Sequence, residues 1–450
     1  MSTETPCVTR ALADWLSSHP YDALPAHAKE KALDVIYDSV GAMTACSILP
    51  EVKTIVDVLG LQGGREECSV IGYPLVTSVV NAAMAHGGMA HGDEVDPVHA
   101  TCVGGHAAAG VVPTALTVGE WIDASGRDVL RAAVLGYEVG GRLMTTFYRE
   151  HDYTVRRFYH TAVAANVSSA VTAGVLLGLD SEQMASALCL AVYQASGPDN
   201  MTRDPVHVGK TFQVAAANRN GVTAALLARE GMKAMQDILD GKQGLFDAYI
   251  GNPDANADLV KDLGSYYSIT DVMHKQFSAG TPNQSYLQGL FRLLEQHQIA
   301  PDDIERIEIH VPARAVKRVP TTRHRSISAL KVCAIAAATG KLDFYQLHDP
   351  SGAIDAAVET MQQRVHFVGR DDWTAMDEGR HTIVIIETRS GKRFEEESWF
   401  RLMDQAQLER KFHQLVEPLF GAERTARVHS LLQGLETASS IRPLLRELRG

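Results

Sequence analysis

Apolar residues recur at helical spacing from residue 21 to residue 261. After Pro25, a residue that suits the first turn of a helix, one apolar face repeats every three to four positions. Its members are Leu33, Ile36, Val40 and Met43. Two later stretches, 161–179 and 214–228, are rich in alanine, serine and glycine. Such small side chains predict helices that pack closely in the middle of a bundle.

Beyond this region the pattern changes to a mixture of strands and helices. Residues 304–312 alternate between apolar and polar positions, which predicts a strand. Residues 381–398 form two alternating runs around a Ser-Gly pair, which is typical of a hairpin. A helical segment, 328–340, lies between them and ends at its final glycine.

The tail of the chain is helical again from Asp404. Its apolar face, Leu408, Phe412 and Leu415, would allow it to fold back onto the first helical part. We therefore predict a mainly α protein with two domains. A large all-helical, discontinuous domain comprises residues 1–270 with 400–450, and a smaller α+β lid domain comprises residues 271–399.

Composition and charge narrow the possible partners. The net charge is −12, without a basic stripe, so we expect no binding of nucleic acid. The six cysteines form no C-x-x-C pair, which argues against a thiolate zinc site and a disulfide framework. The chain opens on polar residues, and no apolar run reaches membrane-spanning length, so we expect a cytoplasmic protein that does not bind membranes.

The common nucleotide, zincin and hydrolase motifs are absent from the sequence. It contains no G-x-G-x-x-G after a strand, no P-loop lysine motif, no H-E-x-x-H and no G-x-S-x-G. These absences do not exclude a reaction catalysed by histidine, aspartate and lysine side chains alone.

Residues 90–110 hold three histidines, two aspartates and a glutamate among glycine, alanine and valine. Burying such groups costs free energy unless they are paired, so they indicate a functional site. Glycine and proline interrupt the segment, which places 92–105 in a loop between helices. A metal site of His91, Asp96 and His99 matches no common zinc spacing, and we expect no metal. The alternative is that the histidines only form hydrogen bonds at helix ends.

Three segments together resemble the signature of the MmgE/PrpD family. Ala90 and His91 are followed by Glu-Val-Asp, which ends at Asp96, and His106 stands ten residues after that aspartate, as in the family. "FYHTA" carries His160 and Thr161 at a second family motif. "DPVHVGK" matches a third motif at the position of His207.

The chain also departs from the family pattern. Asp204 replaces the lysine that precedes Pro-x-His, with Arg203 beside it. Lys275 matches the lysine that opens the lid segment, whereas Gly280 replaces the lid histidine. An acidic group at position 204 would repel a substrate carboxylate, so we expect a substrate with fewer carboxylates than citrate-like acids, or one with an amine or hydroxyl at this place.

The resemblance implies a helical domain covered by a lid, a homodimer, a small carboxylate substrate and no cofactor. It also implies acid–base chemistry next to a carboxylate. Histidine suits this chemistry because its usual pKa, about 6.5, lies near neutral pH. We expect Asp96 and His106 to form an acid–base pair, in which the carboxylate raises the pKa of the imidazole.

The remaining candidate residues surround this pair. We expect His160 to act opposite it, and His207 to bind a substrate oxygen or relay a proton. Arg203 and Lys275 would hold a carboxylate. Further substrate-binding candidates are His99, Thr161 and Asp204. Three interpretations stay open: a dehydratase or decarboxylase, an epimerase or isomerase, and a non-catalytic homologue.

Overall fold

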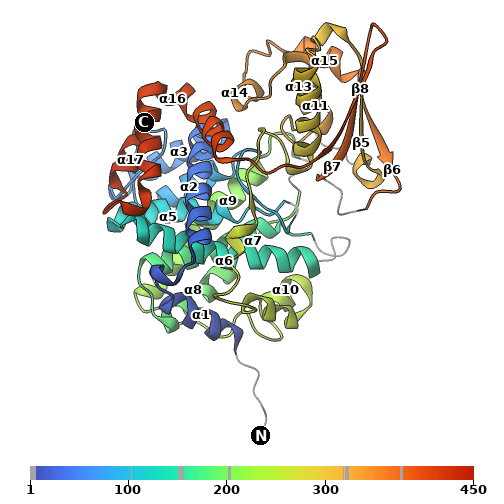
Figure 1. Cartoon of the computed structure of the whole chain (residues 1–450). Helices are drawn as coiled ribbons and strands as arrows, with labels where there is room; N and C mark the ends of the chain where they lie inside the picture. Colours follow the sequence, from blue (N-terminus) through green and yellow to red (C-terminus); the bar gives the residue numbers. More distant parts are fainter. Residues whose placement is uncertain are drawn as a thin grey trace.

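The computed structural model describes residues 7–102, 104–150, 157–200, 204–317, 319, 324–374 and 379–450. It has a large helical part and a smaller part with a sheet, which extends to the upper right in Figure 1. The helical part contains α1 (Val8–Ser18), α2 (Ala26–Cys46), α3 (Pro50–Gln62), α4 (Val79–Ala90), α5 (Ala108–Ile122), α6 (Gly126–Glu150), α7 (His160–Leu176), α8 (Ser181–Gln194), α9 (Val208–Arg229), α10 (Leu245–Ile250), α16 (Gln405–Gln433) and α17 (Arg442–Leu448). The smaller part contains α11 (Gln284–Gln296), α12 (Ala313–Val316), α13 (Ala329–Thr339), α14 (Phe344–Leu347), α15 (Asp355–Gln362), β5 (Ile304–Pro312), β6 (Val365–Arg370), β7 (His381–Thr388) and β8 (Arg393–Trp399).

Helices α4, α5, α7 and α9 form the centre of the helical part, and small residues set their spacing. A Cβ atom added at Gly221 of α9 would lie 2.5 Å from the side chain of Ser169 on α7. Pro113, inside α5, has no N–H to donate to the carbonyl of Ala109. Asn218 of α9 donates to that carbonyl instead, at 3.0 Å. The prediction of closely packed central helices is confirmed.

The sheet of the smaller part has the order β6-β5-β7-β8. Strands β5 and β6 are parallel, whereas β5 with β7 and β7 with β8 are antiparallel. The turn between β7 and β8 contains Gly391, whose φ of 78° suits glycine. The predicted strand, hairpin and helix are all present. Helices α11 and α13 bury one face of the sheet, against Ile307, Ile309 and Val384.

The tail returns to the helical part as predicted. Leu408, Phe412 and Leu415 of α16 are buried in the helical core, and the Phe412 ring stacks on Tyr37 of α2 at 4.4 Å. The predicted fold class, mainly α with a smaller α+β part, is therefore confirmed. The domain bounds themselves stay a prediction.

Short strand pairs connect the parts of the fold. Near the N-terminus, β1 (Cys68–Ser69) pairs with β2 (Val76–Thr77). In the loop between α4 and α5, β3 (Val98–His99) pairs with β4 (Val272–Met273). Because β4 leads into the α+β part, this pairing fixes the α4–α5 loop against the start of the lid.

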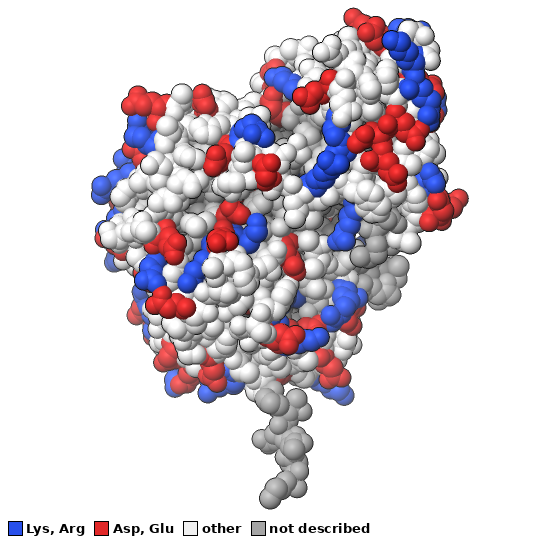
Figure 2. Space-filling model, viewed as in Figure 1, with Lys and Arg blue, Asp and Glu red and all other residues white. Residues whose placement is uncertain are grey.

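The surface and the helix lengths add two observations. On the face shown in Figure 2, acidic and basic side chains are interspersed.

Among the described helices, none alone is long and apolar enough to cross a membrane. Only α2 and α3 together pass that test, and they are bent by 84°.

Candidate active site

The α4–α5 loop brings its ionisable side chains into the interior. His91 caps the C-terminus of α4, and the loop then carries Asp93, Glu94 and Asp96. A Cβ atom added at Gly92 would lie within 2.9 Å of side-chain atoms of α2 and its following turn, so glycine lets the loop pack tightly here. Each of the three carboxylates is at most 6% exposed. Burial at this level requires partners.

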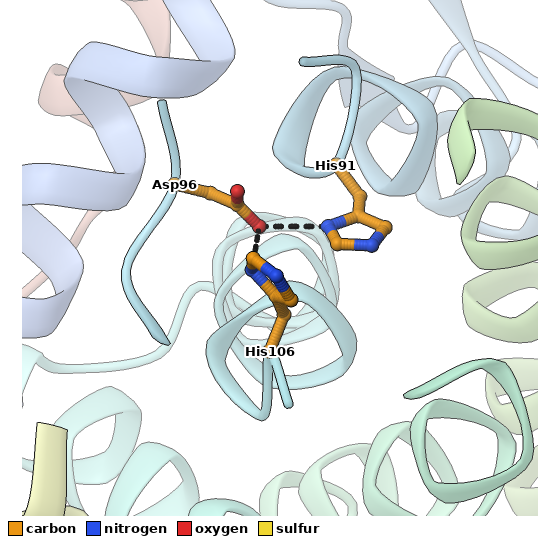
Figure 3. Close-up of side chains that lie close together, drawn as sticks. All are labelled: His91, Asp96 and His106. Atoms are coloured by element: carbon orange, nitrogen blue, oxygen red, sulfur yellow. Dashed lines mark hydrogen bonds and ion pairs between the residues drawn. The ribbon is translucent and has the colours of Figure 1, made fainter. Parts of the chain in front are cut away.

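Asp96 lies between two imidazole rings. Its Oδ2 atom is 2.7 Å from Nδ1 of His91 and 2.9 Å from Nδ1 of His106. Figure 3 shows both rings converging on this oxygen. The His91 contact is an aligned hydrogen bond, whereas the His106 contact is an ion-pair distance without hydrogen-bond alignment.

Tyr159 determines the tautomer of His91. Its hydroxyl lies 2.5 Å from Nε2 of His91, on the other side of the ring from Asp96. Burial raises the pKa of Tyr159 well above its usual range, so the hydroxyl keeps its proton and donates. Nε2 of His91 therefore accepts, and Nδ1–H donates to Asp96. Burial also lowers the pKa of His91 well below its usual value, which keeps this ring neutral.

Two buried lysines contact the other oxygen of Asp96. Nζ of Lys210 lies 3.2 Å from Oδ1, and Nζ of Lys275 lies 3.4 Å from it. Burial by itself raises the pKa of Asp96, but His106, Lys210 and the neighbouring cations outweigh it and hold the pKa well below its usual range. Asp96 is thus a permanent carboxylate at neutral pH, which orients its neighbours and does not exchange protons.

The pKa of His106 differs from the sequence-based expectation. Asp96 does raise it, but burial lowers it more, and Lys275 and Lys210 add to the lowering. The net result is a pKa below the usual 6.5. His106 is therefore neutral at pH 7, the form that can accept a proton.

Glu94 contacts three buried groups. Its Oε2 is 2.7 Å from Nζ of Lys275, and its Oε1 is 3.3 Å from both Nζ of Lys210 and Nε2 of His207. Burial raises the pKa of Glu94, but the two lysines outweigh this and keep it ionised. His207 precedes α9 with a left-handed φ of 60°, and its Nδ1 has no hydrogen-bond partner among the described residues.

Asp93 binds side chains of the lid. Its Oδ2 accepts from Nε2 of His348 at 2.7 Å, and its Oδ1 accepts from Ser326 and lies 3.8 Å from Nδ1 of His324. Burial raises the pKa of Asp93, but the hydrogen bond from His348 and the nearby imidazoles lower it by more than burial raises it. The pKa of Asp93 therefore lies below its usual range. All three lid groups come from residues 324–348, so Asp93 joins the helical part to the lid.

Another buried contact supports the same loop. Lys411 of α16 donates to the carbonyl of Val95 at 2.8 Å, and its Nζ lies 2.6 Å from Oδ1 of Asp38 on α2. His274, next to Lys275, lies 2.8 Å from the other oxygen of Asp38. These contacts hold the loop between α2, α16 and the beginning of the lid.

His160 and Thr161 lie at the first turn of α7. Nε2 of His160 is 3.2 Å from Sγ of Cys102, and Thr161 donates to the carbonyl of Gly104 at 2.9 Å. Burial raises the pKa of Cys102, which keeps it a thiol. The two residues thus hold the far end of the α4–α5 loop, on the side of His106.

The remaining predicted residues have other surroundings. His99 contacts Tyr137 at 3.3 Å and Thr145 at 3.1 Å, both on α6, and burial lowers its pKa to about 4. Asp204 is half-buried and accepts from the backbone of Val206 and Gly209 at the start of α9. Arg203 lies outside the described residues.

Sequence reasoning missed the roles of Lys210, Tyr159 and Glu94. Lys210 stands in the same motif as His207, but the motif gave it no role, and tyrosine has no charge that would draw attention. The one available signal was that Lys210 follows His207 by only three residues, at the start of α9.

The same cluster has the geometry of a cation site. His91, Asp96 and His106 bring three potential ligand atoms within 4.8 Å of one another. However, Lys210 and Lys275 both contact Asp96, so a divalent ion would face two ammonium groups across one carboxylate. This charge distribution disfavours a divalent cation at these three residues.

A cavity of about 630 Å³ lies between the smaller α+β part and α16. Its wall includes Gln276, next to Lys275, and Lys411, which contacts the α4–α5 loop. Lys341 and Asp343 of the same wall form an ion pair at 3.0 Å, and Arg410 adds a further cation. A volume of this size accommodates a small molecule.

Comparison with known families gives matches to two family models. The MmgE/PrpD N-terminal domain matches residues 10–258, and the MmgE/PrpD C-terminal domain matches residues 277–437.

Several similar proteins have related names. The cis-aconitate decarboxylase of Aspergillus terreus is 28% identical over 282 residues, which are 60% of this chain and 57% of that enzyme. The cis-aconitate decarboxylase-like protein oryM of Aspergillus oryzae is 23% identical over 483 residues, which cover 100% of this chain and 98% of the relative. The human cis-aconitate decarboxylase is 29% identical over 226 residues, 47% of this chain and 45% of that enzyme.

Proposed function

Because the chain belongs to the MmgE/PrpD family, we propose that it is a lyase that removes water or carbon dioxide from a small carboxylic acid by cofactor-independent acid–base chemistry. One observation carries the proposal. A neutral, buried His106 lies 2.9 Å from a permanently ionised Asp96, in a cluster with two buried ammonium groups. The names of the relatives support the reaction class.

His106 is the proposed base. Asp96 faces Nδ1, which leaves Nε2 for the substrate. In a dehydration, Nε2 takes the proton next to the carboxylate, the C–H electron pair forms the double bond, and the hydroxyl leaves as water with a proton from His160. In a decarboxylation the C–C bond breaks, carbon dioxide leaves, and the carbanion takes a proton from His160. Proton transfers of this kind contribute about 10²–10⁴-fold to the rate.

The buried lysines hold Asp96 and Glu94 as carboxylates, and ionised Asp96 stabilises the imidazolium that forms when His106 takes the proton. These charge interactions are stronger in a water-poor site than in bulk solvent, because the local dielectric is low.

An epimerase or isomerase is the second candidate, because two family groups are replaced. Gly280 has no side chain, and a Cβ atom added there would be in ordinary van der Waals contact with Asn283 and Ile327, the nearest atom being 3.6 Å away. The carboxylate of Asp204 accepts hydrogen bonds from the backbone N–H groups of Val206 and Gly209. A reaction that needs only proton transfers tolerates the loss of a group that handles the leaving group.

A screen of di- and tricarboxylic acids in deuterated water tests the proposal. A lyase releases a product of lower mass, whereas an epimerase returns its substrate with deuterium at the carbon next to the carboxylate. We expect His106→Gln to lower kcat/KM at least 100-fold, and His413→Gln, on the exposed face of α16, to leave it unchanged. Full activity of the His106→Gln variant would contradict the proposed base.

A further inference from the structure

The side chain of Glu94 is surrounded by groups that bind an anion. Lys275, Lys210 and His207 come from the beginning of the lid and from α9, and they converge on one carboxylate at 2.7 to 3.3 Å. All three side chains are at most 1% exposed. Buried donors that meet in this way from separate elements form a carboxylate-binding site, and here the carboxylate is supplied by the chain itself.

The charges of this pocket are already balanced. Glu94 and Asp96 carry two negative charges, and Lys210 and Lys275 carry two positive charges. Nearby, Lys411 is paired with Asp38. An additional substrate carboxylate placed against the two lysines would therefore leave the buried cluster with an excess negative charge, which is costly in a low dielectric.

We propose that Glu94 is a specificity-determining residue that occupies a carboxylate subsite and excludes a substrate carboxylate from it. The substrate then presents a hydroxyl, amine or apolar group to Glu94, and its reactive carboxylate lies on the side of His106. This inference rests on the proposed function. According to this inference, Glu94 and not Asp204 limits the number of carboxylates on the substrate. The Asp204 carboxylate already accepts hydrogen bonds from the backbone N–H groups of Val206 and Gly209.

Replacement of Glu94 by alanine offers a direct test. The deleted atoms are one methylene carbon and a carboxylate, which are the heavy atoms of acetate. The probe is sodium acetate, titrated into the full-length Glu94→Ala protein while thermal unfolding is followed, with sodium chloride keeping the ionic strength constant. We expect a lower Tm than in wild type and a saturable rise of Tm with acetate, because a ligand that binds only the folded state stabilises it.

Three controls isolate the subsite. Acetamide, the neutral isostere, should not raise the Tm of Glu94→Ala. Acetate should not raise the Tm of wild type or of Glu94→Gln, in which the pocket is still filled. The double variant with Lys210→Met should lose the acetate response. A folded Glu94→Ala protein without an acetate-specific rise, or an equal rise in wild type, overturns the proposal.

If the Glu94→Ala protein does not fold in sodium chloride, the acetate titration is carried out as a refolding assay. Recovery of the native circular dichroism signal with acetate supports the subsite. A chain that stays unfolded in acetate, while Glu94→Gln is folded, overturns it, because the position then needs the shape of the side chain and not a carboxylate.

Kinetics give a second readout once a substrate is known. Glu94→Ala should increase at least tenfold the ratio of kcat/KM for an acid with an extra carboxylate to kcat/KM for the substrate itself, whereas Glu94→Gln, in which the pocket is still filled, should leave that ratio unchanged. Acetate binding needs no turnover, so it separates the two proposals. An acetate response in a protein with no lyase activity would retain the subsite and reject the proposed function, and the reverse result would do the opposite.

Discussion

The hydroxyl of Tyr159 donates to Nε2 of His91 at 2.5 Å, on the opposite side of the ring from Asp96. Tyr159 immediately precedes α7, His91 ends α4, and Asp96 lies in the loop that follows. This chain of hydrogen bonds fixes the tautomer of His91 and directs one oxygen of Asp96 towards His106. Figure 3 shows the resulting arrangement of the two rings.

Tyr159→Phe should therefore reduce activity without removing any group that touches the substrate. Without the hydroxyl, Nε2 of His91 can carry the proton, and the hydrogen bond to Asp96 is weakened. We expect kcat/KM to fall about 10–100-fold, the usual effect of an orienting partner. Steady-state kinetics measure this, with Tyr193→Phe, an exposed tyrosine of α8, as the control. Unchanged kinetics would show that Tyr159 does not orient the site.

The pH dependence of activity should reflect the lowered pKa of His106. Burial keeps this imidazole neutral below its usual pKa of about 6.5. We expect the acidic limb of the kcat/KM profile to have its midpoint below pH 6.5. In Lys275→Met, which removes one cation that lowers the pKa of His106, the midpoint should move upward. A midpoint above 7 in wild type would mean that another group limits the acidic limb.

Stability should also decrease on mild acidification, because several buried histidines are neutral in the folded state. Burial lowers the pKa of His86 to about 3 and the pKa values of His99 and His324 to about 4. In the unfolded chain these groups take up protons below pH 6.5, whereas in the folded protein they do not. Their contribution is thus fully present above pH 6.5 and is lost as the pH falls from 6.5 towards 4.

Urea unfolding between pH 7.5 and 5 measures this loss. Each such histidine contributes up to about 1.4 kcal/mol per pH unit below 6.5. His86→Gln removes one titrating group, so its free energy of unfolding should depend less steeply on pH than that of wild type. The carboxylates of the site do not interfere, because their lowered pKa values affect stability only below about pH 4. An equal slope in both proteins would contradict the assignment for His86.

Asp93 should control how firmly the lid is held. His348→Gln removes the 2.7 Å hydrogen bond to Asp93 and leaves this buried carboxylate with Ser326 and the more distant His324. A hydrogen bond to a charged group contributes about 1.5–3 kcal/mol, and partial exposure of His348 places it near the lower end. Hydrogen exchange of residues 324–348 should become faster in this variant. The exchange of α7 should stay unchanged in the same experiment, and His413→Gln should alter neither segment.

Much of the fold follows from the sequence, because it depends on local pattern. Alternation in 304–312 and in the hairpin around Gly391 requires a sheet with one buried face, and the small residues of α7 and α9 require close packing. The periodic apolar face of α16 likewise indicated its return to the helical part. Each of these features is determined by residues that are near one another in the chain.

The sequence also indicated which loop carries buried ionisable groups, since an apolar segment with six such groups demands partners. It could not identify those partners. Lys210, Lys275 and His348 reach the loop from distant positions, and their effect on a pKa depends on distances of a few ångströms in a low dielectric. For this reason Asp96 was expected to raise the pKa of His106, whereas burial lowers it. Pattern along the chain determined the elements and the loop, and tertiary packing alone decided the charge state of every group within it.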